Sequence, residues 1–166
     1  MPLDVHGYHL DAVVELYCSI FTTDESDDIR ARFQKHAGYA GFRGYVAVSE
    51  INNNVIGFAY GYTSLPGQYY NTKLKEALTL KQADDWLDHC FEFVELAVDG
   101  NYRRHGVATN LHQHLLSGLP HRTSVLTTRT DNTSARTLYD RLGWHVVLEP
   151  FYPNEEPFVI MGKRLK

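Results

Sequence analysis

Apolar and polar residues follow one another along this chain with the periods of both helices and strands. Where apolar residues recur every three or four positions, as they do from Leu10 to Phe21, the pattern predicts an amphipathic helix. Where apolar residues alternate with polar ones or run without a break, the pattern predicts a strand. The predicted helices cover 10–21, 29–36, 106–119 and 133–142. The predicted strands cover 45–49, 55–62, 91–98, 122–128, 144–148 and 158–163, with a short edge strand before Tyr8.

The order of these elements indicates an α/β fold. In the second half of the chain, strands and helices alternate, which is typical of helices packed on a sheet. Three asparagines, Asn52-Asn53-Asn54, form a turn signal between two strands, so hairpins make the sheet mixed. The segment 64–89 fits this scheme least well and is expected to be a loop with one or two short helices. Such a long insert is either functional or a packed surface flap.

The bulk composition is that of one globular domain and argues against several classes of protein. The chain has 166 residues, of which 43% are hydrophobic and 22% charged, so we expect a single domain over 1–166. The net charge of −4, without a run of Lys and Arg, does not favour nucleic acid as a partner. Two cysteines, Cys18 and Cys90, make no disulfide framework, which favours a reducing, cytoplasmic setting. We expect no signal peptide and no membrane span, since no apolar run approaches about 20 residues.

The run from Phe91 to Leu119 carries the strongest chemical signal. An apolar strand passes through a short polar turn into an amphipathic helix, and Arg103, Gly106 and Ala108 occupy the turn and the helix start. The first N–H groups of a helix have no partners within it, and the helix dipole is positive there. A strand, a basic glycine-containing turn and a helix N-terminus together predict a site for phosphate oxygens.

The spacing of this turn excludes two common phosphate loops and resembles a third. Neither G-x-x-x-x-G-K-[ST] nor G-x-G-x-x-G occurs, so the segment is not a P-loop and not a dinucleotide-binding fingerprint. The arrangement Arg103-x-x-Gly106-x-Ala108 resembles the loop with which the GNAT family of N-acetyltransferases binds the pyrophosphate of acetyl-CoA. The pattern of that family is Gln/Arg-x-x-Gly-x-Gly/Ala.

A second resemblance to the same family lies downstream at the expected distance. The segment 132–144 contains Asn-x-x-Ala-Arg-x-x-Tyr-x-x-x-Gly-Trp, and the second family signature has an Asn before a helix and a Tyr one turn before a Gly-aromatic ending. Asn132, Arg136 and Tyr139 follow one edge of the predicted helix, and this edge is expected to face a cleft. The neighbouring apolar stripe, expected to face the sheet, consists of Ala135, Leu138 and Leu142.

The resemblance implies a fold and a cofactor. The fold is a mixed, mostly antiparallel sheet, flanked by about four helices, whose fourth and fifth strands splay apart to hold acetyl-CoA. Backbone groups of the 96–98 triplet would contact the pantetheine arm and the acetyl carbonyl, and N–H groups from 104 to 109 would hold the pyrophosphate. No metal is expected. The residues implied in cofactor binding are Leu96, Ala97, Val98, Arg103, Arg104, His105, Gly106, Val107, Ala108, Thr109, Asn132, Arg136 and Tyr139.

The chemistry of acetyl transfer to an amine defines the catalytic candidates. An alkylammonium with a pKa near ~10.4 must lose a proton before it attacks, and the leaving thiolate must gain one. Tyr139 is the candidate general acid, because its hydroxyl can donate that proton. Glu92 and Glu95 are both candidates for the general base. The family pattern favours Glu92, which lies four residues before the 96–98 triplet, and Glu95 stays open because it directly precedes the triplet. Either carboxylate would need a raised pKa or a water relay.

The sequence therefore predicts an acetyl-CoA-dependent N-acetyltransferase that acts on a primary amine of a small molecule by direct attack in a ternary complex. Two alternatives stay open. One is a non-catalytic acyl-CoA-binding or regulatory module, and the other is an acetyltransferase for a protein or RNA acceptor. Dimers are common in the family, so a homodimer is one expected assembly.

The acceptor site is the least defined part of the prediction. A cationic amine would require an acidic pocket. The acidic residues expected in the loop between the first two helices are Asp24, Glu25, Asp27 and Asp28. Four aromatic residues are expected either to line an acceptor pocket or to pack in a core or at a dimer surface. They are Phe42, Tyr69, Tyr70 and Trp86.

Overall fold

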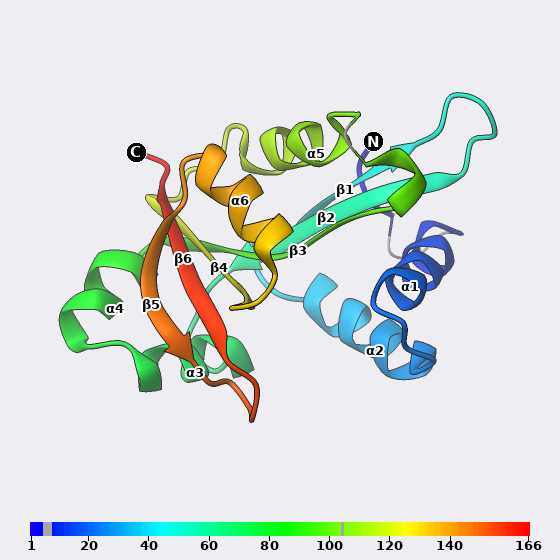
Figure 1. Cartoon of the computed structure of the whole chain (residues 1–166). Coiled ribbons are helices and arrows are strands. Elements are labelled where there is room, and N and C mark those ends of the chain that lie inside the picture. Colours follow the sequence, from blue (N-terminus) through cyan, green and yellow to red (C-terminus); the bar gives the residue numbers. More distant parts are fainter. Residues whose placement is uncertain (5–7, 104) are drawn as a thin grey trace. The chain divides into compact units, whose positions relative to one another are not determined.

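The computed structural model describes residues 1–4, 8–103 and 105–166, which form a mixed α/β structure (Figure 1). The helices are α1 (Tyr8–Ile20), α2 (Ser26–Ala37), α3 (Tyr69–Ala77), α4 (Leu80–Leu87), α5 (Val107–Leu116) and α6 (Thr133–Arg141), with a short 3-10 helix η1 (Gly100–Tyr102). The strands are β1 (Arg43–Val48), β2 (Val55–Thr63), β3 (Cys90–Val98), β4 (Thr123–Arg129), β5 (His145–Phe151) and β6 (Phe158–Arg164).

The six strands form one sheet in the order β1-β2-β3-β4-β6-β5. The pairs β1–β2, β4–β6 and β5–β6 are antiparallel, and β3–β4 is parallel. The parallel ladder contains three residue pairs, from Cys90 with Thr123 to Glu92 with Val125, although β3 continues to Val98. This is the mixed, mostly antiparallel sheet that the sequence predicts, and the insert adds two helices to the four expected.

The chain forms two compact units, each with its own core. The first unit consists of residues 1–62 and 94–118, and the second of residues 63–93 and 119–166. Strand β3 begins in the second unit and ends in the first. Within the described residues, no helix is long and apolar enough to cross a membrane.

The core of the first unit lies between α1, α2 and the strands β1 and β2 (Figure 1). Helix α1 contributes buried Val13 and Val14, which recur with the period that predicts this helix. Phe33 of α2 is fully buried, and its ring centroid lies 4.9 Å from that of Tyr60 and 5.7 Å from that of Phe58. Helix α5 packs against the other side of β2, where Leu111 lies beside Gly57.

Two boundaries in the first unit differ from the prediction. Helix α2 begins at Ser26 rather than at 29, so Asp27 and Asp28 lie in its first turn and not in a loop. Carboxylates are favourable there because the N-terminal end of a helix dipole is positive. The expected edge strand is short: the Leu3 N–H donates to the Gly44 carbonyl over 2.9 Å, and α1 already begins at Tyr8.

The insert 64–89 is packed into the core of the second unit. Its helices α3 and α4 contribute Leu74, Leu78 and Leu87, which are buried with Phe151 and Ile160. Helix α4 begins with a reciprocal pair of hydrogen bonds between Thr79 and Gln82, the arrangement known as a capping box. The insert therefore forms two helices, as the sequence allows, and stabilises the sheet beneath it.

Trp86 of α4 lies flat against β6. A Cβ atom added to Gly162 would lie 2.5 Å from the Trp86 ring, so the ring occupies the space that any larger residue at 162 would fill. The Arg164 guanidinium carbon lies 4.2 Å from the centroid of the same ring, which is a cation–π contact. Trp86 thereby fastens the insert to the last strand.

Candidate functional site

The N-terminus of α5 presents backbone donors without helical partners. Gly106 precedes the helix with φ 77°, and no side chain caps it. The first helical hydrogen bond runs from the Asn110 N–H to the Gly106 carbonyl over 3.0 Å. The N–H groups of Val107, Ala108 and Thr109 therefore lie before the first bonded turn, where an anion binds favourably.

The surroundings of this first turn are open. A Cβ atom added to Gly106 would meet no atom within 4 Å, so the glycine is required by its left-handed backbone and not by crowding. A cavity of about 700 Å³ in the first unit borders the same turn and is lined in part by Tyr102, His105, Val107 and Asn110. Space for a ligand thus adjoins the free N–H groups.

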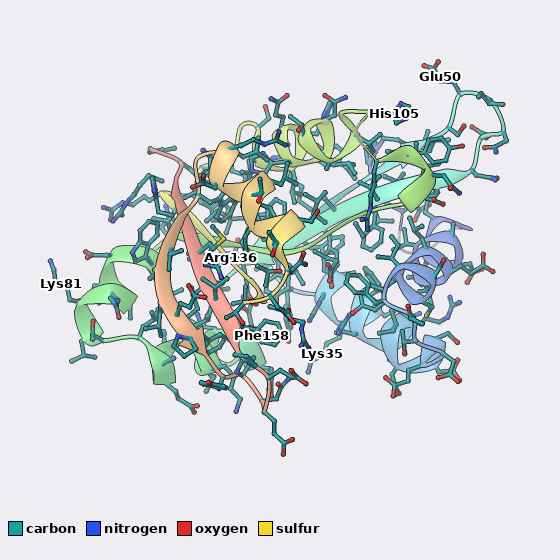
Figure 2. The ribbon with its side chains drawn as sticks, in the orientation of Figure 1. Lys35, Glu50, Lys81, His105, Arg136 and Phe158 are labelled. Carbon is teal, nitrogen blue, oxygen red and sulfur yellow. The ribbon has the colours of Figure 1, made fainter. Side chains whose placement is uncertain are left out.

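The side chains expected around the phosphate are accessible. Arg103 follows η1 and is exposed, and His105 is exposed at the start of α5 (Figure 2). Arg104, also expected here, lies outside the described residues. Asp99 accepts a hydrogen bond from the Asn101 N–H over 2.9 Å, which fixes the turn that leads from β3 into this loop.

Glu95 lies directly before the triplet at the end of β3, in the same unit as the α5 N-terminus. Burial raises the pKa of its carboxyl to about 7, and the nearby Arg32 charge and a hydrogen bond from the Leu96 backbone lower it in part. In the triplet itself, Ala97 is buried, whereas Leu96 and Val98 are half-buried. A carboxyl group that titrates near neutral pH has the proton affinity that general base catalysis requires.

Glu92, the other candidate base, lies in the second unit and is 6% exposed. Burial raises the pKa of its carboxyl to about 8. Among the described residues, its Oε2 atom is buried and has no hydrogen-bond partner. A neutral acid is the favourable form in such surroundings, because an ionised carboxylate would lose its hydration without compensation.

We expect Glu92→Gln to remove a pH dependence of stability. The pKa of Glu92 in the folded protein, about 8, lies above that of an unfolded chain. The stability that Glu92 contributes is therefore fully present below the pKa of the unfolded chain, near ~4.3. It is lost as the pH rises through the pKa of the folded protein. Each pH unit in this window is worth at most about 1.4 kcal/mol. The difference between the urea midpoints at pH 5.5 and pH 8 should be smaller for Glu92→Gln than for the wild type, and the remaining difference comes from other groups with a raised pKa in this window, such as Glu95.

The exposed Glu155 of the same unit provides the matched control. Glu155→Gln should retain the wild-type difference between the two midpoints. Equal midpoint differences in wild type and Glu92→Gln would show that Glu92 does not carry a proton in the folded protein.

Asn132 caps the N-terminus of α6 in the second unit. The Asn132 side-chain oxygen accepts a hydrogen bond from the Ala135 N–H over 3.2 Å, and its amide donates to Thr128 over 3.4 Å. Arg136 forms a bidentate ion pair with Glu149, at 2.7 and 2.8 Å, and donates to the Thr130 carbonyl over 2.9 Å (Figure 2). These contacts occupy Arg136 within its own unit.

Tyr139 is the buried residue of α6. It is 7% exposed, and its ring meets those of Phe93 and Trp144 edge to face at centroid distances of 6.0 and 5.8 Å. This differs from the expectation of an open helix edge, because Ala135 and Leu138 of the predicted apolar stripe are only half-buried. Two aromatic neighbours hold the Tyr139 ring in one position, which is what a group that acts at a fixed point requires.

A cluster on α2 and β2 was not predicted from the sequence. The His36 Nδ1 atom lies 2.9 Å from the Tyr60 hydroxyl, and the His36 ring also contacts Tyr39 and Tyr62. Burial, with the charges of Arg32 and Lys35, lowers the pKa of His36 to about 4. His36 is thus neutral at neutral pH, and the charge of Arg32, on the same helix, acts on the Glu95 carboxyl. The spacing of 32, 35 and 36 along one helix face was the available signal.

The aromatic residues that the sequence suggests for an acceptor pocket lie in different parts of the structure. Phe42 packs against the core of the first unit, and Tyr70 and Trp86 pack against that of the second. Tyr69 is 60% exposed. In the described ranges, no group of three or more His, Cys, Asp and Glu side chains is arranged to hold a metal ion.

Comparison with known proteins identifies the family. Residues 10–144 match the acetyltransferase (GNAT) family. A putative GNAT acetyltransferase from Desulfovibrio desulfuricans has a similar structure, with a TM-score of 0.69, 15% identity and coverage of 100% of this chain and 98% of that one. No curated protein sequence matches the chain.

Two further structures share the fold. The spermidine N-acetyltransferase SpeG from Vibrio cholerae, solved as a variant, has a TM-score of 0.64, 14% identity and coverage of 99% and 94%. The NatC complex bound to a Gag peptide and CoA has a TM-score of 0.69, 18% identity and coverage of 100% and 97%. Fold and family match together define an acyltransferase. The chain belongs to the GNAT family of acetyltransferases, which use acetyl-CoA.

Proposed function

We propose that this protein acetylates the primary amine of a small molecule, by direct attack on acetyl-CoA in a ternary complex, and that residues 1–166 act as one catalytic domain. The observation that carries this proposal is the uncapped first turn of α5, directly downstream of β3 and Glu95. Backbone donors with fixed direction suit the pyrophosphate of CoA. The matching family supports acetyl-CoA as the donor.

In the proposed reaction, the amine nitrogen attacks the acetyl carbonyl, a C–N bond forms and the C–S bond of the thioester breaks. In passing from ammonium to amide the nitrogen loses two protons. Glu95 takes one through water and passes it to solvent. Tyr139 gives one to the departing thiolate and regains the second from the nitrogen through solvent. Backbone N–H groups of the triplet 96–98 stabilise the oxyanion without reorganisation.

We choose Glu95 over Glu92 as the base. Glu95 is half-buried and its carboxyl titrates near neutral pH, whereas the Oε2 atom of Glu92 is buried. A base must reach the proton that it removes. We assign to Asn132 a contact with the cofactor near the sulfur of CoA, as the family pattern implies. We assign to Arg136 the role of holding Glu149, because three N–H donors of Arg136 are already used by Glu149 and Thr130.

The test is acetyl-CoA binding by calorimetry together with release of free CoA in the presence of a panel of amines. Binding with release by one amine class supports the proposal. Binding without release favours a regulatory module or a macromolecular acceptor, and a ribosomal or peptide N-terminus would then be tested. Absence of binding would contradict the assignment of the α5 turn.

We expect Gly106→Val to raise the Kd for acetyl-CoA about tenfold or more. At φ 77° a β-branched residue is strained, so the turn must change and the N–H groups of α5 turn away from the phosphate. Gly118, at the other end of α5, also has a left-handed backbone with φ 75° and open space around it. Gly118→Val therefore carries the same strain and should leave the Kd unchanged. Equal effects of both substitutions would point to stability alone.

A further inference from the structure

The cavity beside the α5 turn is larger than a phosphate group requires. Its volume of about 700 Å³ lies within the range of about 300–1,000 Å³ that is typical of small-molecule sites. Ile56 of β2 and Leu111 of α5 contribute buried apolar surface to it. Val107 belongs both to its lining and to the free N–H groups of the α5 turn. A ligand that places a phosphate at this turn can therefore extend into the cavity.

Flat rings from three elements line the same cavity. Tyr45 lies on β1, Tyr102 on η1 and His114 on α5, and the ring centroids of Tyr45 and His114 are 5.8 Å apart. Among the described residues of the lining there is no Lys or Arg, and the exposed Glu50 is the only acid (Figure 2). Aromatic side chains are surfaces on which nucleobases stack. The cavity thus suits an uncharged planar ring better than a second phosphate.

The pantetheine arm of CoA is not the part of the cofactor that the cavity would hold. The triplet 96–98, which is expected to contact this arm, contributes no residue to the described lining. His105 and Val107, next to the proposed pyrophosphate position, do contribute to it. Pantetheine and adenosine are attached to opposite ends of the pyrophosphate. The end that does not follow the triplet is therefore the adenosine end.

We propose that the adenine ring of CoA occupies this cavity and stacks against Tyr102, and that the Asn110 amide pairs with the polar edge of the base. The inference rests on the proposed acetyl-CoA site and locates the nucleotide end of that same cofactor. Asn110 is exposed and lines the cavity from α5. An amide can donate to and accept from an adenine edge at the same time. Adenine nucleotides without a pantetheine arm should therefore bind and compete with acetyl-CoA.

Calorimetry with fragments of the cofactor tests this placement. ADP carries the adenosine and the pyrophosphate, inorganic pyrophosphate lacks the adenosine, and pantetheine lacks both. We expect the Kd of ADP to be at least tenfold lower than that of pyrophosphate, and we expect acetyl-CoA to displace ADP. A base that stayed in solvent would add nothing to the affinity of the pyrophosphate.

Two substitutions change the cavity in different ways. Ala47→Phe fills it from β1 with a residue that strands accommodate well, and Tyr102→Ala removes the stacking ring. Each should raise the Kd of ADP at least fivefold and leave that of pyrophosphate within about twofold. The exposed residues Phe21 and Ala40 lie outside the described lining, so Phe21→Ala and Ala40→Phe are the matched controls and should change neither Kd. Thermal melting checks that each variant folds.

The outcomes separate this inference from the proposed function. Binding of acetyl-CoA, with ADP no tighter than pyrophosphate, overturns the placement of the adenine and leaves the proposed function standing. An equal loss of ADP and pyrophosphate affinity in Tyr102→Ala also overturns the placement, because the substitution then acts on the phosphate site. So does ADP binding that acetyl-CoA does not displace. Binding of neither acetyl-CoA nor any fragment overturns both.

Discussion

We expect Tyr139→Phe to lower kcat about 100-fold while the Kd for acetyl-CoA stays within about twofold of the wild-type value. The substitution removes the hydroxyl that we propose as the proton donor to the thiolate, and loss of a general acid typically costs about 10²–10⁴-fold. The phenyl ring retains its edge-to-face contacts with Phe93 and Trp144, so packing in the second unit is preserved. Steady-state kinetics of CoA release and calorimetry with acetyl-CoA measure the two quantities.

The control for this prediction is Tyr152→Phe. Tyr152 belongs to the same unit and is 59% exposed, so loss of its hydroxyl should change neither quantity. A wild-type kcat in Tyr139→Phe would remove Tyr139 from proton transfer and leave it a packing role between two aromatic rings.

Glu95→Gln should lower kcat/KM by about 100-fold or more and remove the inflection near pH 7 from its pH profile. We expect the wild-type kcat/KM to rise with pH through the Glu95 pKa of about 7, because the proposed base acts as a carboxylate. Glutamine is isosteric but accepts no proton, so the inflection near pH 7 disappears along with most of the rate, and the remaining rate follows the fraction of neutral amine. Profiles of kcat/KM from pH 5.5 to pH 9 test both expectations.

Two other substitutions make this result specific. Glu15→Gln, at an exposed position of α1, should leave the profile unchanged. Glu92→Gln distinguishes the two candidate bases: a large rate loss there, with a normal profile in Glu95→Gln, would move the role of base from Glu95 to Glu92.

Much of the fold could be predicted because local signals agree with the tertiary structure. The cap at Asn132, the glycine before α5 and the apolar run of β3 each define an element through its own residues. The start of α2 was misplaced, because acidic residues suit both a loop and the first turn of a helix.

The site was predicted less completely, because several of its properties depend on contacts between distant segments. Arg32 and Glu95 are 63 positions apart in the sequence, and only the folded chain lets the charge of Arg32 act on the Glu95 carboxyl. The spacing of residues along α6 predicts which side chains share a helix face, but it does not predict which face is buried. The burial of Tyr139 follows from Phe93 and Trp144, which lie on other elements of the second unit. Likewise, the family pattern favours Glu92 over Glu95, but the local sequence does not show how far burial raises the pKa of each carboxyl.

The contact between Trp86 and Gly162 links the evolution of two distant segments. A relative that shortens the insert and loses this indole is released from the requirement for glycine on β6, and a side chain there would refill the uncovered sheet. Conversely, a relative that keeps the tryptophan must keep the glycine, because a methyl group would already overlap the ring. The two positions should therefore vary together across the family, and their joint state would indicate whether a homologue carries helix α4 in this position.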